Sequence, residues 1–94
     1  ALSKEFAKDN ITINCILPER IATDRQVRII NHQAKLANIT YEEALKIVED
    51  DLPAKRMGKV EEISGICAFL CSQQAAFITG QSISVDGGSS EYLL

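Results

Sequence analysis

Apolar and polar residues follow one another along the chain in blocks whose period changes several times. Residues 2–8 place apolar side chains at helical spacing, and the Asp9-Asn10 pair that follows predicts the end of a helix. Residues 11–17, ITINCIL, alternate at first and then become continuously apolar, which predicts a strand covered on both faces. Pro18 lacks the amide hydrogen that a strand ladder uses, so we expect the strand to stop there.

The middle of the chain, residues 24–52, has helical spacing. One amphipathic helix is predicted to run up to Asn38. Its apolar positions are Val27, Ile29, Ile30, Ala34, Leu36 and Ala37. Thr40 stands three residues before Glu43, a capping-box signature that predicts a second helix over 41–50. Two short helices between a strand end and the next core element are typical of a lid, not of a core layer.

The last third of the chain predicts one more helix and one more strand. Gly58 interrupts the pattern, and Glu61 and Glu62 then stand in the first turn of a helix, where carboxylates face the positive end of the helix dipole. The apolar stripe of this helix is Ile63, Ile66, Cys67, Leu70 and Cys71. Residues 81–86 alternate with a period of two and end at a pair of glycines. The order helix, strand, two lid helices, helix, strand predicts an α/β fold with two parallel strands.

Two strands leave the apolar stripes of these helices largely unburied, and this bounds the fold. A stable sheet normally has three or more strands with a covered face. The chain starts at Ala1 directly in a helical pattern, with no leader. We therefore interpret it as one end of a larger doubly wound α/β sheet, with the rest missing from this chain. Its three parts are residues 1–23 with the first strand, the lid over 24–57, and the last helix and strand over 58–94.

Composition narrows the classes of function. The chain of 94 residues is 46% hydrophobic and 24% charged, as expected for a soluble, globular chain. A net charge of −3 argues against nucleic acid as a partner, and no apolar run approaches the roughly 18 residues of a membrane span. The scattered Cys15, Cys67 and Cys71 favour buried thiols in a reducing cytoplasm over disulfides. No third metal ligand is grouped with Cys67 and Cys71, since His32 is far away in the sequence.

Three stretches together resemble the C-terminal portion of the short-chain dehydrogenase/reductases. They read SKEFAKDNITINCILP, then RIATD, then MGKVEEISGICAFLCSQQAAFITGQSISVDGG. The resemblance covers nearly the whole chain and is weakest across residues 26–52. It implies a Rossmann fold that binds NAD or NADP, with hydride passing between the nicotinamide and the carbonyl or alcohol carbon of a small-molecule substrate. It also implies that the last helix and strand pack against a neighbouring subunit in a homotetramer or homodimer.

The resemblance assigns the edge of the cofactor site to the segment after the first strand. Family members usually carry Pro-Gly and, two or three residues later, a Thr. This chain carries Pro18, Glu19, Ile21 and Thr23 at the cofactor-binding positions. By resemblance, backbone groups of Ile21 hold the nicotinamide carboxamide, and Thr23 lies near the phosphates. Independently, ligands of open α/β sheets bind beyond the carboxyl ends of the strands. Glu19 departs from the family glycine and brings a Cβ and a charge.

The catalytic residues of the family have no counterpart in this sequence. By resemblance, the active Tyr stands four residues before a Lys, with a Ser upstream. Here Lys46 follows Tyr41 at the wrong spacing, and no Lys follows Tyr92. The five glycines form no dinucleotide fingerprint. We therefore assign no catalytic residue and no metal ligand, and we expect these 94 residues alone to catalyse nothing.

Two classes of function stay open. The first is an NAD(P)-dependent oxidoreductase, either 3-oxoacyl-carrier-protein reductase-like or a sugar or secondary-alcohol dehydrogenase. The second is a non-catalytic scaffold or binding protein that kept the assembly surface of the fold. Lys55, Arg56 and Lys59 are interpreted first as a solvated loop and second as a docking point for an acidic carrier or a phosphorylated substrate. His32 is interpreted as a solvated or half-buried lid residue.

Overall fold

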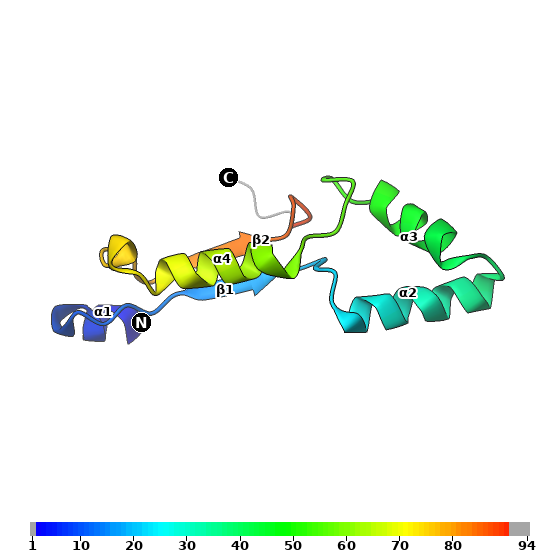
Figure 1. Ribbon diagram of the computed structural model, residues 1–94. Helices are drawn as coiled ribbons and strands as arrows, with labels where there is room; N and C mark the ends of the chain where they lie inside the picture. The colour runs from blue at the N-terminus through cyan, green and yellow to red at the C-terminus, as the bar shows by residue number, and fades with distance from the viewer. Residues whose placement is uncertain (1, 91–94) are drawn as a thin grey trace.

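The computed structural model describes residues 2–90, and its elements form two groups along an elongated molecule of 57 × 27 × 20 Å (Figure 1). The sheet, α1 and α4 form one group, and α2 and α3 form the other. Two segments connect the groups, one from β1 to α2 and one from α3 to α4. The elements in order are α1 (Leu2–Phe6), η1 (Ala7–Asp9), β1 (Cys15–Pro18), α2 (Asp24–Ala37), α3 (Tyr41–Asp50), α4 (Val60–Leu70), η2 (Gln73–Ala75) and β2 (Ser82–Val85).

The two strands pair in parallel, as predicted, with Cys15 opposite Ser82 and Pro18 opposite Val85. β1 begins four residues later than predicted because the preceding residues bond to the turn before β2 rather than to a strand. The amide of Ile13 donates to Thr79 Oγ1 at 3.0 Å, and the Ile13 carbonyl accepts from the amide of Gly80 at 2.8 Å. The strand stops at Pro18, as predicted, and Pro18 is its last residue. It takes the last paired position, where its missing amide hydrogen costs no ladder bond.

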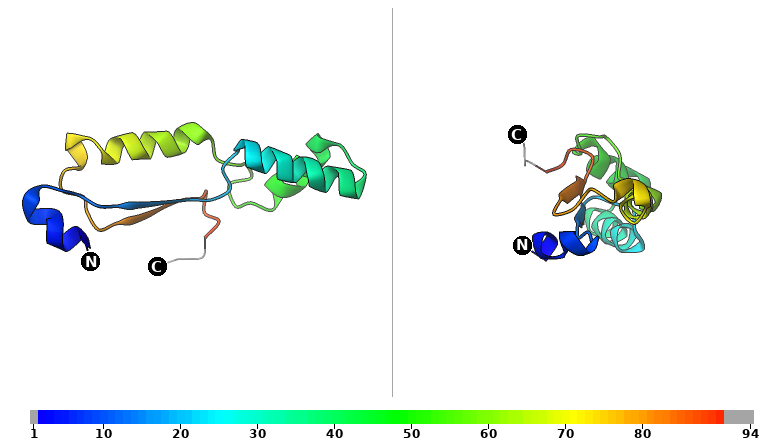
Figure 2. Two further views of the ribbon diagram at one scale, coloured as in Figure 1. Left: turned by 90° about the horizontal axis from the view of Figure 1, so that it is seen from below. Right: turned by 90° about the vertical axis from the view of Figure 1, so that its left-hand side faces the viewer.

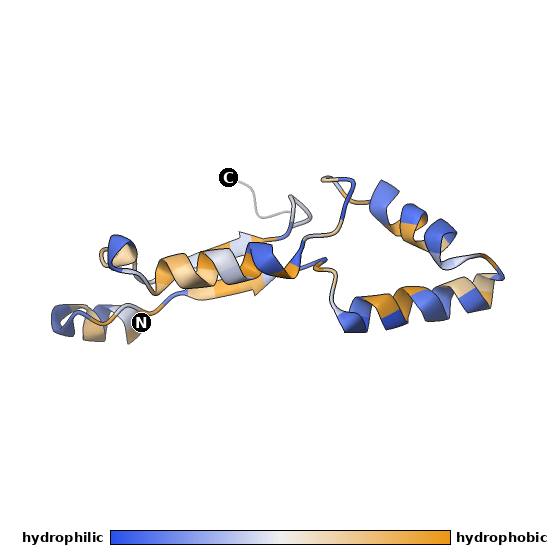
Figure 3. Ribbon diagram, in the orientation of Figure 1, coloured by the Kyte–Doolittle hydropathy of each residue, from blue (hydrophilic) through white to orange (hydrophobic). Residues whose placement is uncertain are grey.

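α4 runs back along one side of the two strands (Figures 1 and 2). Its first turn carries Glu61 and Glu62, as predicted. Glu62 accepts a hydrogen bond from the amide of Lys59 at 2.9 Å, which satisfies one of the free donors at the start of the helix. Apolar residues concentrate on α4 and β1, whereas α2 and α3 show apolar and polar residues in turn (Figure 3).

The best-buried cluster of the described residues lies in residues 24–57, the predicted lid. Its members are Ile30, Ala34, Ala44, Leu52 and Met57. Thr40 and Glu43 form the full capping box that was predicted, with bonds of 3.0 and 3.1 Å. α2 ends at Asn38, where the pattern was predicted to break, and Asn38 takes the left-handed conformation at φ 56°. This cluster packs the two helices against each other, and the expectation of a lid separate from the core layers stays a prediction. Within residues 2–90, five of the seven buried hydrophobic residues belong to this cluster.

Three expectations about burial are wrong. Leu36 of the predicted apolar face of α2 is 76% exposed, because only the side of α2 near Ile30 and Ala34 meets α3. β1 is not covered on both faces, since Leu17 is 47% exposed. All three cysteines are exposed rather than buried: Cys15 lies in β1, Cys67 in α4 and Cys71 directly after α4. No helix in the described part of the chain has the length and apolarity to cross a membrane.

Candidate functional site

The segment that follows β1 leaves the sheet at the carboxyl ends of both strands. The amide of Glu19 donates to the carbonyl of Val85 at 3.2 Å, which keeps this segment beside the end of β2. Arg20 then adopts φ 61°, a left-handed conformation that turns the chain away from the sheet. The strained position is therefore Arg20, next to Glu19.

A short parallel bridge closes the base of the lid. Ile21 pairs with Gly58: the amide of Ala22 donates to the Gly58 carbonyl at 2.9 Å, and the Gly58 amide donates to the Arg20 carbonyl at 2.9 Å. We call residues 20–22 and 56–59 the lid neck. A Cβ on residue 58 would lie 2.7 Å from Ile21 Cδ1, so the glycine lets the two segments meet. Ile21 itself is buried at 9% exposure.

The four predicted cofactor residues gather on one hollow of about 420 Å³. Its lining residues are Pro18, Glu19, Arg20, Ile21, Thr23, Arg25, Gln26, Val60 and Ile63. The walls contributed by Ile21, Val60 and Ile63 are apolar, while Thr23 and Arg25 bring a hydroxyl group and a positive charge. An apolar wall next to a cation and a hydroxyl suits a flat aromatic ring that carries phosphate groups.

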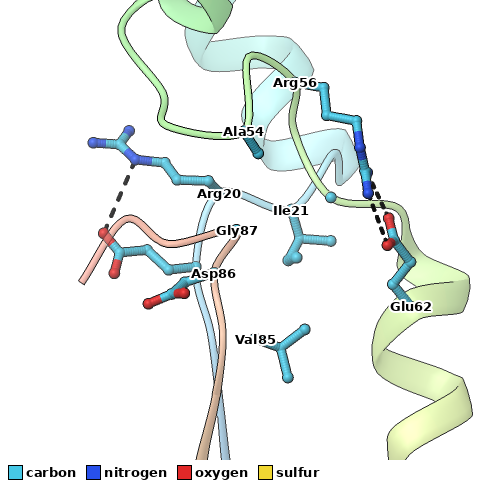
Figure 4. Close-up of a pocket in the computed structure, with 10 residues that line it drawn as sticks. Arg20, Ile21, Ala54, Arg56, Glu62, Val85, Asp86 and Gly87 are labelled. Carbon is cyan, nitrogen blue, oxygen red and sulfur yellow. Dashed lines mark hydrogen bonds and ion pairs between the residues drawn. The ribbon is translucent and has the colours of Figure 1, made fainter. Parts of the chain in front are cut away.

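A second, smaller hollow of about 60 Å³ lies between the neck and the end of β2 (Figure 4). Ile21 and Val85 enter it from the two strand ends, Ala54 from the lid, and Arg56 and Glu62 from the side of α4. Its volume leaves room for one or two water molecules and no cofactor ring. The larger of these two hollows is the candidate ligand site because all four predicted cofactor residues line it, and the smaller one belongs to the supporting structure of the neck.

The charged groups around the neck form one defined network. Arg56 Nη1 and Nη2 donate to the two carboxylate oxygens of Glu62 at 2.7 and 3.0 Å, and Arg56 Nη1 also donates to the carbonyl of Met57 at 3.1 Å. The hydrogen bonds from Arg56, and then the one from the Lys59 amide, lower the pKa of Glu62 to about 2. The same pair raises the pKa of Arg56. By contrast, Arg20 Nε and Glu19 Oε1 are 4.0 Å apart, a weak contact between exposed groups.

The end of β2 is held by its own carboxylate. Asp86 accepts hydrogen bonds from the backbone amides of Gly88 and Ser90, both at 3.0 Å. Hydrogen bonds from Ser90 and then from the Gly88 amide hold the pKa of Asp86 below its usual value. Gly87 and Gly88 adopt φ values of 61° and 87°, so the turn beyond Asp86 uses the left-handed conformations that glycine allows.

We expect the carboxyl group of Glu62 to titrate with a midpoint near pH 2 in the folded protein. Its pKa is lower folded than the unfolded value of 4.5, so the pair stabilises the fold above pH 4.5 and loses its contribution as the pH falls toward 2. Carboxyl carbon chemical shifts measured during an acid titration test this. The Arg56→Gln variant is the control, and it should move the midpoint back toward 4.5. An unchanged midpoint in that variant would contradict the assignment of the cause.

The sequence profile of a family described as Enoyl-(Acyl carrier protein) reductase matches residues 1–90. The chain belongs to the short-chain dehydrogenase/reductase family. It is 42% identical over 88 residues to the NADPH-dependent reductase BacG of Bacillus subtilis, covering 94% of this chain and 34% of that protein. It is 38% identical over 88 residues to 2,3-dihydroxy-2,3-dihydro-p-cumate dehydrogenase of Pseudomonas putida, covering 94% of this chain and 31% of the relative.

Solved structures of short-chain dehydrogenase/reductases share the fold. The L-sorbose reductase of Gluconobacter frateurii, solved with NADPH and L-sorbose, superposes with a TM-score of 0.88 at 34% identity, covering 98% of this chain and 35% of that one. YwfH, an NADPH-dependent reductase involved in bacilysin biosynthesis, superposes with a TM-score of 0.82 at 39% identity, covering 98% and 35%. These matches confirm the predicted class, an α/β parallel-sheet Rossmann fold. The chain spans about a third of the length of these relatives.

The structure does not place the other candidate residues of the sequence analysis in the larger hollow. Tyr41 packs against the lid cluster, His32 is exposed on α2, and Tyr92 lies outside the described residues. The basic residues near Gly58 do not act as one group, because Arg56 is paired with Glu62 while Lys55 donates to the carbonyl of Asp50. Sequence reasoning missed the neck itself. Its one visible signal was Gly58, which was interpreted only as a break before a helix.

Proposed function

We propose that the protein is an NAD(P)-dependent oxidoreductase in which the Pro18–Thr23 segment forms one edge of the nicotinamide site. The observation that carries the proposal is that Pro18, Glu19, Ile21 and Thr23 line a single hollow at the carboxyl ends of the parallel strands. In this proposal residues 1–94 are the C-terminal segment of one Rossmann domain: 1–23 hold the cofactor edge, 24–57 the substrate lid and 58–94 the last helix and strand.

The residues present fit a dinucleotide chemically. Ile21, Val60 and Ile63 offer apolar contact to one face of a nicotinamide ring and keep water from it. Backbone groups of Ile21 bind the carboxamide, and Thr23 and Arg25 face the phosphates. The bound nicotinamide supplies hydride transfer to or from a carbonyl or alcohol carbon. The lid, α2 and α3, covers the substrate and sets its orientation.

Relatives with similar sequences support this choice of cofactor and substrate class. BacG is named as an NADPH-dependent reductase, and the sorbose reductase was solved with NADPH and L-sorbose. We propose NAD or NADP as cofactor and a small carbonyl or alcohol as substrate. Within that class, a 3-oxoacyl-carrier-protein reductase-like specificity and a sugar or secondary-alcohol specificity are the two candidates. The family description shares with the first candidate an acyl-carrier-protein substrate, although an enoyl reductase reduces a carbon–carbon double bond, and the sorbose reductase favours the second.

The test is turnover by the full-length protein. Oxidation of NADPH and of NADH is followed by absorbance with three substrates: a 3-oxoacyl thioester, a ketose and a simple secondary ketone. We expect oxidation of one cofactor with at least one of them. The intact mass of the native protein, with its sequence upstream of Ala1, shows whether a Tyr and a Lys at four-residue spacing accompany this chain.

A non-catalytic scaffold is the second candidate, and Glu19 in place of the family glycine favours it. Cofactor titration separates the two, since a full-length protein that binds neither NADPH nor NADH supports the scaffold. In either case we propose that α4 and β2 pack against a neighbouring subunit in a homotetramer or homodimer. The 41% exposure of Phe69 on α4 supports an apolar contact there. Three free thiols support a reducing cytoplasm as the location.

Replacing Glu19 with glycine is expected to tighten cofactor binding to the full-length enzyme by about 1 kcal/mol, on the scale of one modest contact. Glycine removes a Cβ and a charge from the rim of the hollow. Fluorescence titration with reduced and oxidised cofactor measures the change. The Glu19→Gln variant separates the two causes, since it keeps the side chain and removes the charge. If Glu19→Gly changes the affinity for neither the reduced nor the oxidised cofactor, Glu19 points to solvent.

A further inference from the structure

We propose that Arg56 is a positioning residue that fixes the lid neck and, through it, the cofactor edge at Ile21. The inference rests on the proposed function and adds to it a residue that contributes nothing to the lining of the larger hollow. Arg56 lies between two bodies, the lid that precedes it and α4 that follows it. Its contacts reach both, and the residue two positions later forms the bridge to Ile21.

Arg56 is anchored to the first turn of α4 through Glu62. Nη1 of Arg56 donates to Oε1 of Glu62, and Nη2 donates to Oε2. This two-pronged arrangement fixes the plane of the guanidinium group as well as its position. Glu62 is itself held, because its Oε1 also accepts from the amide of Lys59 at 2.9 Å. The carboxylate therefore joins the start of α4 to the end of the lid, and its position is set from two sides.

Met57 and Gly58 connect Arg56 to the proposed cofactor edge at Ile21. Arg56 Nη1 donates to the carbonyl of Met57, whose side chain is 8% exposed within the lid cluster. The next residue, Gly58, makes the two backbone hydrogen bonds of the neck, and Ile21 lies where a Cβ of residue 58 would stand. A displacement of the 56–58 backbone is therefore expected to move Ile21 or Met57, because two backbone hydrogen bonds tie residue 58 to the 20–22 segment and the Met57 side chain is buried in the lid cluster.

An ordinary surface ion pair is the alternative. The two side chains are 53% and 41% exposed, and exposed pairs contribute little to stability. The chain offers a direct comparison: Lys46 Nζ and Asp50 Oδ2, one turn apart on α3, form an exposed pair at 3.4 Å with no link to the neck. A surface pair affects only its immediate surroundings, whereas a positioning residue affects amides and chemistry on the far side of the neck.

The experiment uses the full-length protein with Arg56→Gln, Arg56→Lys and, as matched control, Lys46→Gln. Hydrogen exchange of the Ala22 and Gly58 amides is measured first. We expect about tenfold faster exchange at both amides in Arg56→Gln, a smaller change in Arg56→Lys, which keeps the charge but loses the two-pronged geometry, and no change in Lys46→Gln. Unchanged exchange at both amides in Arg56→Gln would overturn the proposal.

The second readout is hydride transfer. In Arg56→Gln we expect kcat to fall about tenfold, since misplacement of reacting groups by a fraction of an ångström costs rate directly. We also expect the isotope effect with cofactor deuterated at C4 to rise and the KM of the carbonyl substrate to stay within about twofold of wild type. A lower melting temperature with kcat and isotope effect unchanged would mean a merely structural role and overturn the proposal.

The two readouts also separate this inference from the proposed function. A wild-type protein that transfers no hydride and binds no cofactor removes the proposed function, and the amide exchange rates still decide whether Arg56 holds the neck. A wild-type protein that is active, with an Arg56→Gln variant that matches it in exchange and in kcat, removes this inference alone.

Discussion

Replacing Ile30 with alanine is expected to lower the free energy of unfolding by about 3 kcal/mol, within the range measured for large-to-small changes in well-packed cores. Ile30 is the most buried large side chain of the described residues, at 2% exposure. It lies in the cluster formed by α2, α3 and the segment up to Met57. Alanine removes three carbon atoms and leaves a cavity that the surrounding helices fill only in part.

The same helix supplies the control for this prediction. Leu36 is 76% exposed, so Leu36→Ala removes an apolar side chain of the same size from water-exposed surface and is expected to change stability by less than about 0.5 kcal/mol. Urea unfolding of the full-length variants, with proteolysis of the lid as a local probe, measures both. Equal losses in the two variants would mean that α2 does not bury its Ile30 face against α3.

Replacing Gly80 with alanine is expected to cost about 2 kcal/mol, most of it from placing a side chain in the left-handed region. Gly80 has φ 73°, and a Cβ there would lie 2.8 Å from Ser3 Oγ. Ser3 is buried, and the Gly80 amide donates to the carbonyl of Ile13 at 2.8 Å, so the turn cannot relax without losing that bond. Thermal unfolding of the full-length protein measures the loss.

Gly65 is the matched control for Gly80. It lies inside α4, where no atom of the described residues comes within 4 Å of an added Cβ, and its φ is outside the left-handed region. Gly65→Ala is therefore expected to stabilise the protein by up to about 1 kcal/mol, the difference in helix propensity. Two alanine variants that shift the melting temperature in the same direction would contradict the conformational argument.

Local sequence rules predicted the elements whose stability is local. The Thr40–Glu43 capping box determined where α3 begins, and its bounds, Tyr41–Asp50, are those predicted. Asn10 and Asn38 both end helices in the left-handed conformation, at φ 61° and 56°. These features depend on residues within one turn of each other, so no distant part of the chain was needed to specify them.

Burial was harder to predict, because hydrophobicity shows that a side chain avoids water but not which surface covers it. Cysteine is a residue type that is commonly buried, yet Cys15, Cys67 and Cys71 are exposed in the described part of the chain. Ile11 was expected to begin the first strand, but β1 begins at Cys15 because Ile13 and Asn14 bond to the turn at residues 78–81. These partners are more than 60 residues away in sequence, beyond the reach of any periodicity.

The sequence by itself determined the family, the order of elements and the segment that holds the candidate cofactor edge, since strand, proline and helix signals are local and the family motifs are contiguous. Only the tertiary structure decided how that edge is held. The bridge between Ile21 and Gly58 joins segments that are distant in sequence and meet because the chain between them folds back on itself. The ion pair between Arg56 and Glu62 is local, and it holds the second of these segments against the start of α4. Contacts between distant segments depend on the path of the backbone in space, and the spacing of residues along the chain does not specify that path.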